Sequence, residues 1–189
     1  MLLAVLFTSG YGVANYLTMI FLPTYAAVFG GVGEKQALAA NTAGQALALC
    51  VVPLAAWLTD WALPRRTLLV IVFAAEFFVA WCGIALARHG GIAGVWVAQL
   101  GFAFLFALIM AAEPATLAEL FRSEYRLSGY SLSFNLGIGF AGGTAPVVAT
   151  ALIAATGNDL APAWYLMLAA VVAAGAAFLM ADWSRKPLR

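Results

Sequence analysis

The sequence predicts an all-α membrane protein with six transmembrane helices, and three observations carry this prediction. Hydrophobic residues make up 65% of the 189 residues and charged residues only 9%, whereas a soluble domain carries about 25% charged residues. Six apolar runs follow one another, each long enough to cross a hydrocarbon core of ~30 Å as a helix. Lipid offers the backbone no hydrogen-bond partner, and the runs are far too long for barrel strands, so they must be helices.

The predicted domain is a single six-helix unit over residues 1–189. Charged and glycine-rich connections separate the expected helices, which cover residues 2–29, 36–58, 67–87, 92–112, 127–156 and 162–181. The first run is too long for a signal peptide and no basic region precedes it, so we expect a retained helix. A Met that leads straight into apolar sequence also favours a late start within a longer protein.

Basic residues are divided unequally between the two sides of the predicted membrane domain. The side with the second loop, the fourth loop and both termini holds seven of them: Arg65, Arg66, Arg122, Arg126, Arg185, Lys186 and Arg189. The other side holds only Lys35 and Arg88. Because cytoplasmic loops carry the excess of Lys and Arg, we expect both termini to be cytoplasmic in an inner (plasma) membrane.

The chain offers little material for catalysis or metal binding. Its sole histidine, His89, falls in a short outer loop, so a Ser–His pair and a histidine metal site lack the residues they need. Cys50 and Cys82 lie inside apolar runs and are expected to be small buried hydrophobes. We therefore expect no enzymatic activity, no cofactor and no metal, and nothing indicates nucleic acid as a partner.

Three of the predicted helices each present a narrow polar face with an amide side chain. Residues three or four apart share one helix face, and this spacing groups Tyr11 with Asn15, Asn41 with Gln45, and Ser131 with Asn135. Polar groups inside a membrane are costly, so these positions need an explanation. One interpretation is a water-filled solute path lined by the three faces. The alternative is hydrogen bonding between helices. Taken together, the set favours a path.

Glu76 is the acidic residue placed well inside a predicted span. Intramembrane carboxylates often relay charge, which makes Glu76 a candidate proton or cation site. The alternative is a protonated packing residue, since its neighbours along the chain are aromatic and aliphatic.

The fifth predicted helix is weakened in its middle. Glycines interrupt it and Pro146 removes one backbone donor, which frees a carbonyl. The residues concerned are Gly137, Gly139, Gly142, Gly143 and Pro146. Transporters use such interrupted helices as hinges and binding elements. Close packing without motion is the alternative interpretation.

The loop after the second predicted helix holds Asp60, Arg65 and Arg66. An Asp at a helix end beside two arginines can clamp neighbouring helices when a gate on that side closes. A solvated turn that follows the positive-inside rule is the alternative. The spacing of these three residues resembles the conserved loop of the major facilitator superfamily, although Ala56 and Leu63 replace that family's glycines.

A second segment carries a more specific resemblance to the same superfamily. It contains Glu-Leu-Phe at 119–121, Ser-Gly at 128–129, Asn-Leu-Gly at 135–137 and Gly-Gly-Thr-Ala-Pro at 142–146. This combination resembles the tenth-to-eleventh helix region of the metabolite:H⁺ symporter branch. The resemblance covers almost the whole chain and implies helices seven to twelve of a twelve-helix carrier, which is half of the family's fold.

The resemblance implies proton-coupled transport of a small organic solute, an organic acid or zwitterion, by the C-terminal half of a carrier. Its expected partners are the lipid bilayer, the solute, protons, and a missing N-terminal half or a second copy. In order of preference, the chain is a fragment of a longer carrier, a degenerate remnant, or a half-transporter. The alternative function is a non-transporting remnant or scaffold whose polar residues serve helix packing. The sequence does not identify the solute.

Overall fold

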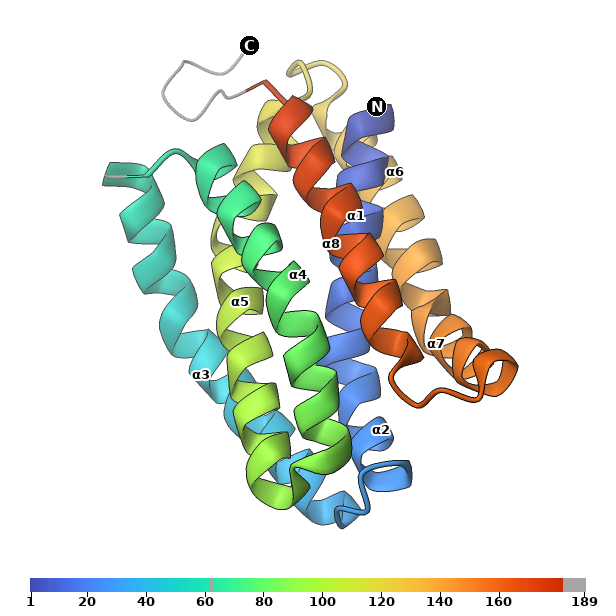
Figure 1. The fold of residues 1–189 in the computed structure, drawn as a ribbon. Coiled ribbons are helices and arrows are strands. Elements are labelled where there is room, and N and C mark those ends of the chain that lie inside the picture. The colour runs from blue at the N-terminus through green and yellow to red at the C-terminus, as the bar shows by residue number, and fades with distance from the viewer. Residues whose placement is uncertain (62, 182–189) are drawn as a thin grey trace.

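The computed structural model describes residues 1–61 and 63–181 of the chain. These residues form helices joined by short turns and contain no strand. Six helices in this part of the chain are long and apolar enough to cross a membrane. The predicted all-α class with six spans is therefore confirmed. The N-terminus lies at the same end of the bundle as the second and fourth connections (Figure 1).

Two of the six spans are interrupted by π-helical turns, and four are continuous helices. The first span comprises α1 (Leu2–Asn15), the π-helical η1 (Tyr16–Phe21) and α2 (Leu22–Val28). The fifth comprises α6 (Arg126–Phe134), the π-helical η2 (Asn135–Gly142) and α7 (Gly143–Thr156). The continuous spans are α3 (Glu34–Trp61), α4 (Arg65–His89), α5 (Gly91–Glu119) and α8 (Ala161–Leu179).

Several helices continue beyond the apolar runs that predicted them. The largest difference is in α5, which ends at Glu119 where the sequence indicated residue 112. A helix that leaves the hydrocarbon core keeps its backbone hydrogen bonds by continuing, so charged residues mark the edge of the membrane and not the helix end. The extension places Glu113 and Glu119 on a helix, although the charged segment around them read as a connection.

The six spans are buried to different extents, the first most and the second and fifth least. α5 packs against both α3 and α4, whereas α1 packs against both α8 and η2. In Figure 1, α4 and α8 lie nearest the viewer, with α3 at one edge and α6 and α7 at the other. In the most apolar stretch of the first span 67% of residues are buried, against 22% in the second and fifth spans. The first span is thus central, and α3 and the fifth span expose most of their surface.

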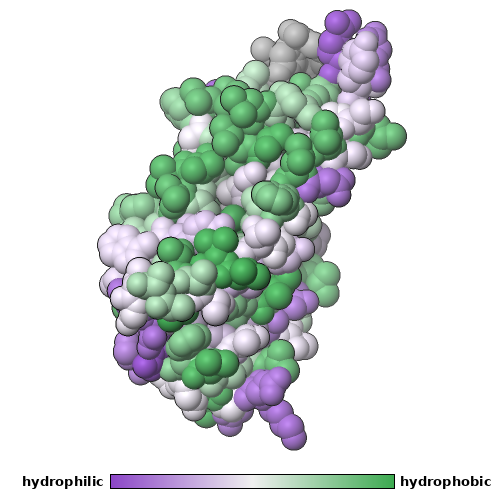
Figure 2. Space-filling view, turned by 90° about the vertical axis from the view of Figure 1, so that its right-hand side faces the viewer, coloured by the Kyte–Doolittle hydropathy of each residue, from purple (hydrophilic) through white to green (hydrophobic). Residues whose placement is uncertain are grey.

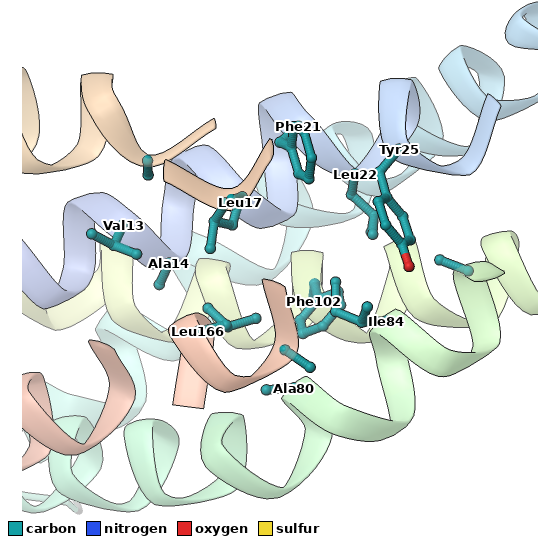
Figure 3. Packing of buried hydrophobic residues seen from close by; sticks show 14 of the residues in the cluster. Val13, Ala14, Leu17, Phe21, Leu22, Tyr25, Ala80, Ile84, Phe102 and Leu166 are labelled. Carbon is teal, nitrogen blue, oxygen red and sulfur yellow. The ribbon is translucent and has the colours of Figure 1, made fainter. Parts of the chain in front are cut away.

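The core is built around the first span. Leu17, Leu22 and Tyr25 are fully buried and belong to one cluster with Phe102 of α5 and Leu166 of α8 (Figure 3). Helices in lipid associate through close packing, because lipid tails are as apolar as the side chains. Small residues permit this. A Cβ on Gly10 of α1 would overlap the backbone of α8.

The outward surface is apolar as well as the core. On the side formed by α6, η2 and α7, apolar and weakly polar residues cover most of the face, and hydrophilic residues lie at both ends and along its right-hand edge (Figure 2). Cys50 and Cys82 are both exposed, so the prediction that they are buried is wrong. An apolar run in a membrane protein includes the side chains that face lipid, and therefore does not by itself indicate burial.

Candidate functional site

Polar side chains of α3 and α5 converge on the π-helical turn η1. Pro23 has no N–H, so the carbonyl of Met19, four residues earlier, lacks its usual helical donor. Asn41 supplies one, since its Nδ2 donates to Met19 O over 3.0 Å. The fully buried Gln99 donates from Nε2 to Thr18 O over 3.2 Å. The two amides thus provide donors to the carbonyls of the interrupted first span.

Asn41, Gln99 and Gln45 together form what we call the amide cluster. Gln99 Nε2 donates to Asn41 Oδ1 over 3.2 Å, and Gln45 Nε2 donates to the same oxygen over 3.4 Å. Gln99 Oε1 is buried and has no hydrogen-bond partner among the described residues. The cluster therefore runs from a buried amide to the exposed Gln45. Sequence reasoning missed Gln99, for which a lone amide in an apolar run was the available signal.

The structural role of Asn41 gives a first prediction. We expect Asn41→Leu to lower the free energy of unfolding by about 1–2 kcal/mol, because it removes the side-chain donor to Met19 O and one of the acceptors of the buried Gln99 amide. Thermal unfolding of the purified chain in detergent measures this. The control is Thr42→Leu, since Thr42 is exposed and bonds only Leu38 O of its own helix. Equal loss in both variants would contradict this role.

The fifth span presents a second polar surface. Ser131 and Asn135 are exposed, and Asn135 Nδ2 donates to Ser131 O of its own helix over 2.7 Å. A Cβ on Gly139 would meet nothing within 4 Å. Together with the exposed Ser128, these residues form what we call the polar stripe. All of them are exposed, whereas Gln99 of the amide cluster is fully buried.

The predicted hinge residues divide into two groups. Gly137 and Gly142 are buried against α1, where a Cβ would overlap backbone atoms of Thr8 and Gly12 respectively. A Cβ on Gly139 or Gly143 would meet nothing within 4 Å. One side of η2 is therefore a tight helix contact and the other is open. Pro146 follows in α7, half-buried.

The polar residues of α1 are less accessible than the sequence suggested. Tyr11 is 3% exposed, and its hydroxyl donates to Met110 Sδ over 2.7 Å. Asn15 is half-buried. The first span contacts α3 through α2 and the fifth span through η2, so it lies between the other two polar surfaces. The structure thus brings the three faces onto neighbouring spans, with Tyr11 turned inward.

Two carboxylates lie deep in the bundle. Glu76 is 3% exposed and Glu113 is 1% exposed. Among the described residues, one oxygen of each has no hydrogen-bond partner. The Glu113 carboxylate is close enough to interact electrostatically with Tyr11 and Tyr130. Sequence reasoning missed Glu113 because it ended the fourth helix at residue 112; the helix-favouring Ala-Thr-Leu-Ala-Glu-Leu run after Pro114 was the signal.

At the end of the bundle with the N-terminus, one arginine ties three helix ends together. Arg65 pairs with Asp60 over 2.7 Å and also with Glu119, and the Arg65 and Glu119 side chains are only 19% and 14% exposed. We call these three residues the charge clamp. The predicted gate residue Arg66 does not join it. Arg66 donates to Phe178 O and lies over the Phe178 ring, 5.0 Å from its centroid.

The opposite end has an ion pair that the sequence analysis did not propose. Arg88 Nε lies 2.8 Å from Asp159 Oδ2, and the Tyr25 hydroxyl donates to Asp159 O over 2.8 Å. These contacts join the ends of α2 and α4 to the connection between α7 and α8. Nearby, a cleft of about 630 Å³ separates η1 and α2 from α7, with Thr24 and Thr150 as its polar lining residues.

Six apolar spans that bear internal polar surfaces define a multi-pass membrane protein. Within the described residues, no group of three or more His, Cys, Asp or Glu side chains is arranged to hold a metal ion. No family model matches the chain.

Known proteins similar to the chain are transporters. It is 26% identical over 181 residues to the ectoine/proline transporter ProP of Corynebacterium glutamicum, an alignment that covers 96% of this chain and 35% of that protein. It is 26% identical over 157 residues to the citrate-proton symporter of Salmonella typhi, covering 82% of this chain and 36% of that protein. A putative proline/betaine transporter of Staphylococcus aureus is 28% identical over 169 residues, covering 86% of this chain and 34% of that protein.

The predicted resemblance to the major facilitator superfamily is confirmed by these relatives and by the six apolar helices, which fit half of such a carrier. The chain spans about a third of the length of the relatives it matches. All three relatives are named as transporters, which favours a role other than catalysis.

Proposed function

We propose that the chain is the C-terminal six-helix half of a proton-coupled carrier for a small organic acid or zwitterion. The relatives are named as transporters of ectoine, proline and betaine and as a citrate-proton symporter. The excess of basic residues on one side supports a placement in the inner membrane with both termini cytoplasmic.

The observation that carries the proposal is the exposed polar stripe on a membrane span. Lipid cannot solvate the Asn135 amide or the Ser131 hydroxyl, so a surface of this kind faces water or protein in the membrane. In a carrier built from two halves, it lines the path between them. Gln45 of α3 and Asn15 of α1 extend this lining on the neighbouring spans, and Tyr11 and Asn41 support it from within.

Proton coupling is assigned to the two buried carboxylates. Glu76 and Glu113 are buried, and one oxygen of each lacks a partner in the described part of the chain. A carboxyl group in such surroundings is stable when it is neutral, and a charge on it is costly. A proton relay uses such a group, which holds a proton and is charged only transiently. Glu113 is better placed to act, because it is close enough to interact electrostatically with Tyr11 and Tyr130, which lie on spans that carry the polar faces.

Opening and closing are assigned to the charge clamp and to η2. The clamp of Asp60, Arg65 and Glu119 holds three helix ends together, as a closed gate on the cytoplasmic side requires. Bending is assigned to the π-helical turn η2, because π-helical turns disturb the regular hydrogen bonds of a helix. Gly139 and Gly143 on its open side leave room for this bending, and Pro146 weakens the helix further.

Uptake of radiolabelled proline, betaine, ectoine or citrate tests the proposal. The assay uses vesicles with an imposed proton gradient that contain the full-length protein encoded by the gene to which this chain belongs. We expect Asn135→Ala to reduce uptake at least tenfold while changing the free energy of unfolding by no more than ~0.5 kcal/mol, as at an exposed position. The matched control is Leu136→Ala, an exposed apolar neighbour on the same turn. Equal uptake by both variants would refute the assignment of Asn135.

A non-transporting scaffold is the second candidate, and the amide cluster favours it. Asn41 and Gln99 donate hydrogen bonds to carbonyls of the first span, and the Tyr11 hydroxyl donates to Met110. Contacts of this kind are what helix packing alone requires. Under this reading a folded protein moves none of the four solutes in the same vesicles. Uptake of any one of them, driven by the proton gradient, excludes the scaffold.

A further inference from the structure

A groove runs along the outward side of α4 and α8, a surface to which the proposed transport path assigns no role. These two helices pack against each other and lie nearest the viewer in Figure 1. The groove has a volume of about 450 Å³ and an apolar lining that includes Phe73, Phe77, Phe78, Ala174, Gly175 and Phe178. A Cβ on Gly175 would meet nothing within 4 Å, so the groove is open at this point.

A second hollow, of about 300 Å³, continues the groove towards the end of the bundle where α4 begins. It is lined by Arg66, Thr67 and Ile71, and it shares Val70 and Phe178 with the groove. From Arg66 to Phe78 the helix rises about 18 Å at 1.5 Å per residue. Half of a hydrocarbon core measures about 15 Å. Groove and hollow together thus extend from the membrane surface to about its middle.

Arg66 places a cation at the outer end of this continuous groove. Its contacts are the carbonyl oxygen and the ring of Phe178. Within the described part of the chain it forms no ion pair with a carboxylate, whereas its neighbour Arg65 forms two. A guanidinium has five N–H donors, so donors remain for an anion that approaches along the surface.

We propose that this groove binds an anionic phospholipid, with one acyl chain along α4 and α8 and the phosphate on Arg66. The occupant follows from three features: an apolar channel as long as one leaflet is deep, exposure to lipid, and, among the described lining residues, a cation only at the surface end. Basic pockets between helices at a membrane surface bind anionic headgroups in this way. The other half of a carrier is excluded as occupant because the polar surfaces assigned to it lie on α3 and the fifth span.

Native mass spectrometry of the purified chain in mild detergent tests the proposal. The probes are phosphatidylglycerol and phosphatidylcholine with identical acyl chains. We expect one phosphatidylglycerol to be retained in preference to phosphatidylcholine. Arg66→Gln should lower phosphatidylglycerol occupancy about fivefold, as expected for the loss of one surface cation, while Arg66→Lys keeps the preference. Gly175→Leu should lower the occupancy of both lipids, because its side chain fills the groove.

Two controls separate this site from general effects. Arg122→Gln removes a cation that is 73% exposed and 3.9 Å from Glu124, and Gly101→Leu adds the same side chain where a Cβ also meets nothing within 4 Å. Both should retain wild-type lipid occupancy, and thermal unfolding checks that every variant is folded.

Three results would overturn the proposal. Equal loss in Arg66→Gln and Arg122→Gln would indicate lipid held by surface charge alone. Full competition by glycerol phosphate, with no effect of Gly175→Leu, would indicate a site for free anions. A lipid-free dimer that Gly175→Leu converts to a monomer would indicate that a second copy covers the groove.

Discussion

Gly137→Val is expected to lower the free energy of unfolding by about 3 kcal/mol, the upper end of the cost of overpacking a core. A Cβ at this position would overlap Thr8, both its hydroxyl and its backbone. Thr8 cannot move aside easily, because its hydroxyl donates to Ser133 O over 2.7 Å and so ties α1 to α6. The measurement is thermal unfolding of the purified chain in detergent.

The control for this prediction lies on the same π-helical turn. Gly139→Val adds the same side chain two residues away, where a Cβ meets nothing within 4 Å. It should change stability by less than ~0.5 kcal/mol, as most substitutions away from packed features do. If both variants lose the same stability, the loss comes from helix propensity in η2, and close packing between α1 and η2 at Gly137 does not account for it.

Arg65→Gln carries the second large expected effect. It removes the cation of the charge clamp and leaves Glu119, whose side chain is only 14% exposed, without its partner. Breaking a buried pair costs 3–5 kcal/mol and an exposed one about 0–1 kcal/mol, so we expect a loss of about 2 kcal/mol for this partly buried network. Denaturant or thermal unfolding in detergent measures the loss.

A double-mutant cycle with Glu119→Gln isolates the contact. We expect the two changes to be non-additive by at least ~1 kcal/mol, as for residues within one salt-bridge network. Arg122→Gln is the control, because its pair with Glu124 is long and both side chains are more than half exposed. Strict additivity of Arg65→Gln and Glu119→Gln would show that the clamp contributes nothing to holding the three helix ends together.

The number of spans followed from the sequence because lipid imposes a single requirement, that the backbone satisfy its own hydrogen bonds. The ends of the helices did not, since hydropathy locates the membrane boundary and α5 continues past it to Glu119. This difference explains why Glu113 was missed as a buried carboxylate.

For the candidate site, the sequence predicted several of the polar residues but not the contacts that they make. Helical spacing found the stripe with Ser131 and Asn135, which the structure leaves exposed. It could not show that Asn41 compensates for Pro23, because that contact joins two helices whose relative rotation depends on packing. It also could not separate Arg65 from Arg66, which are adjacent in sequence but contact different helices, α5 and α8.

Thiol accessibility distinguishes a water-filled path along the polar stripe from a stripe in lipid or in a dry contact. With Cys50 and Cys82 replaced by Ala, Asn135→Cys and Phe140→Cys each introduce one thiol on the fifth span, the second at an exposed apolar position. In membrane vesicles, a water-soluble maleimide should label Asn135→Cys much faster than Phe140→Cys, and a transported solute should slow the labelling. Equal, slow labelling of both positions would place the stripe in lipid or in a dry contact and contradict the account.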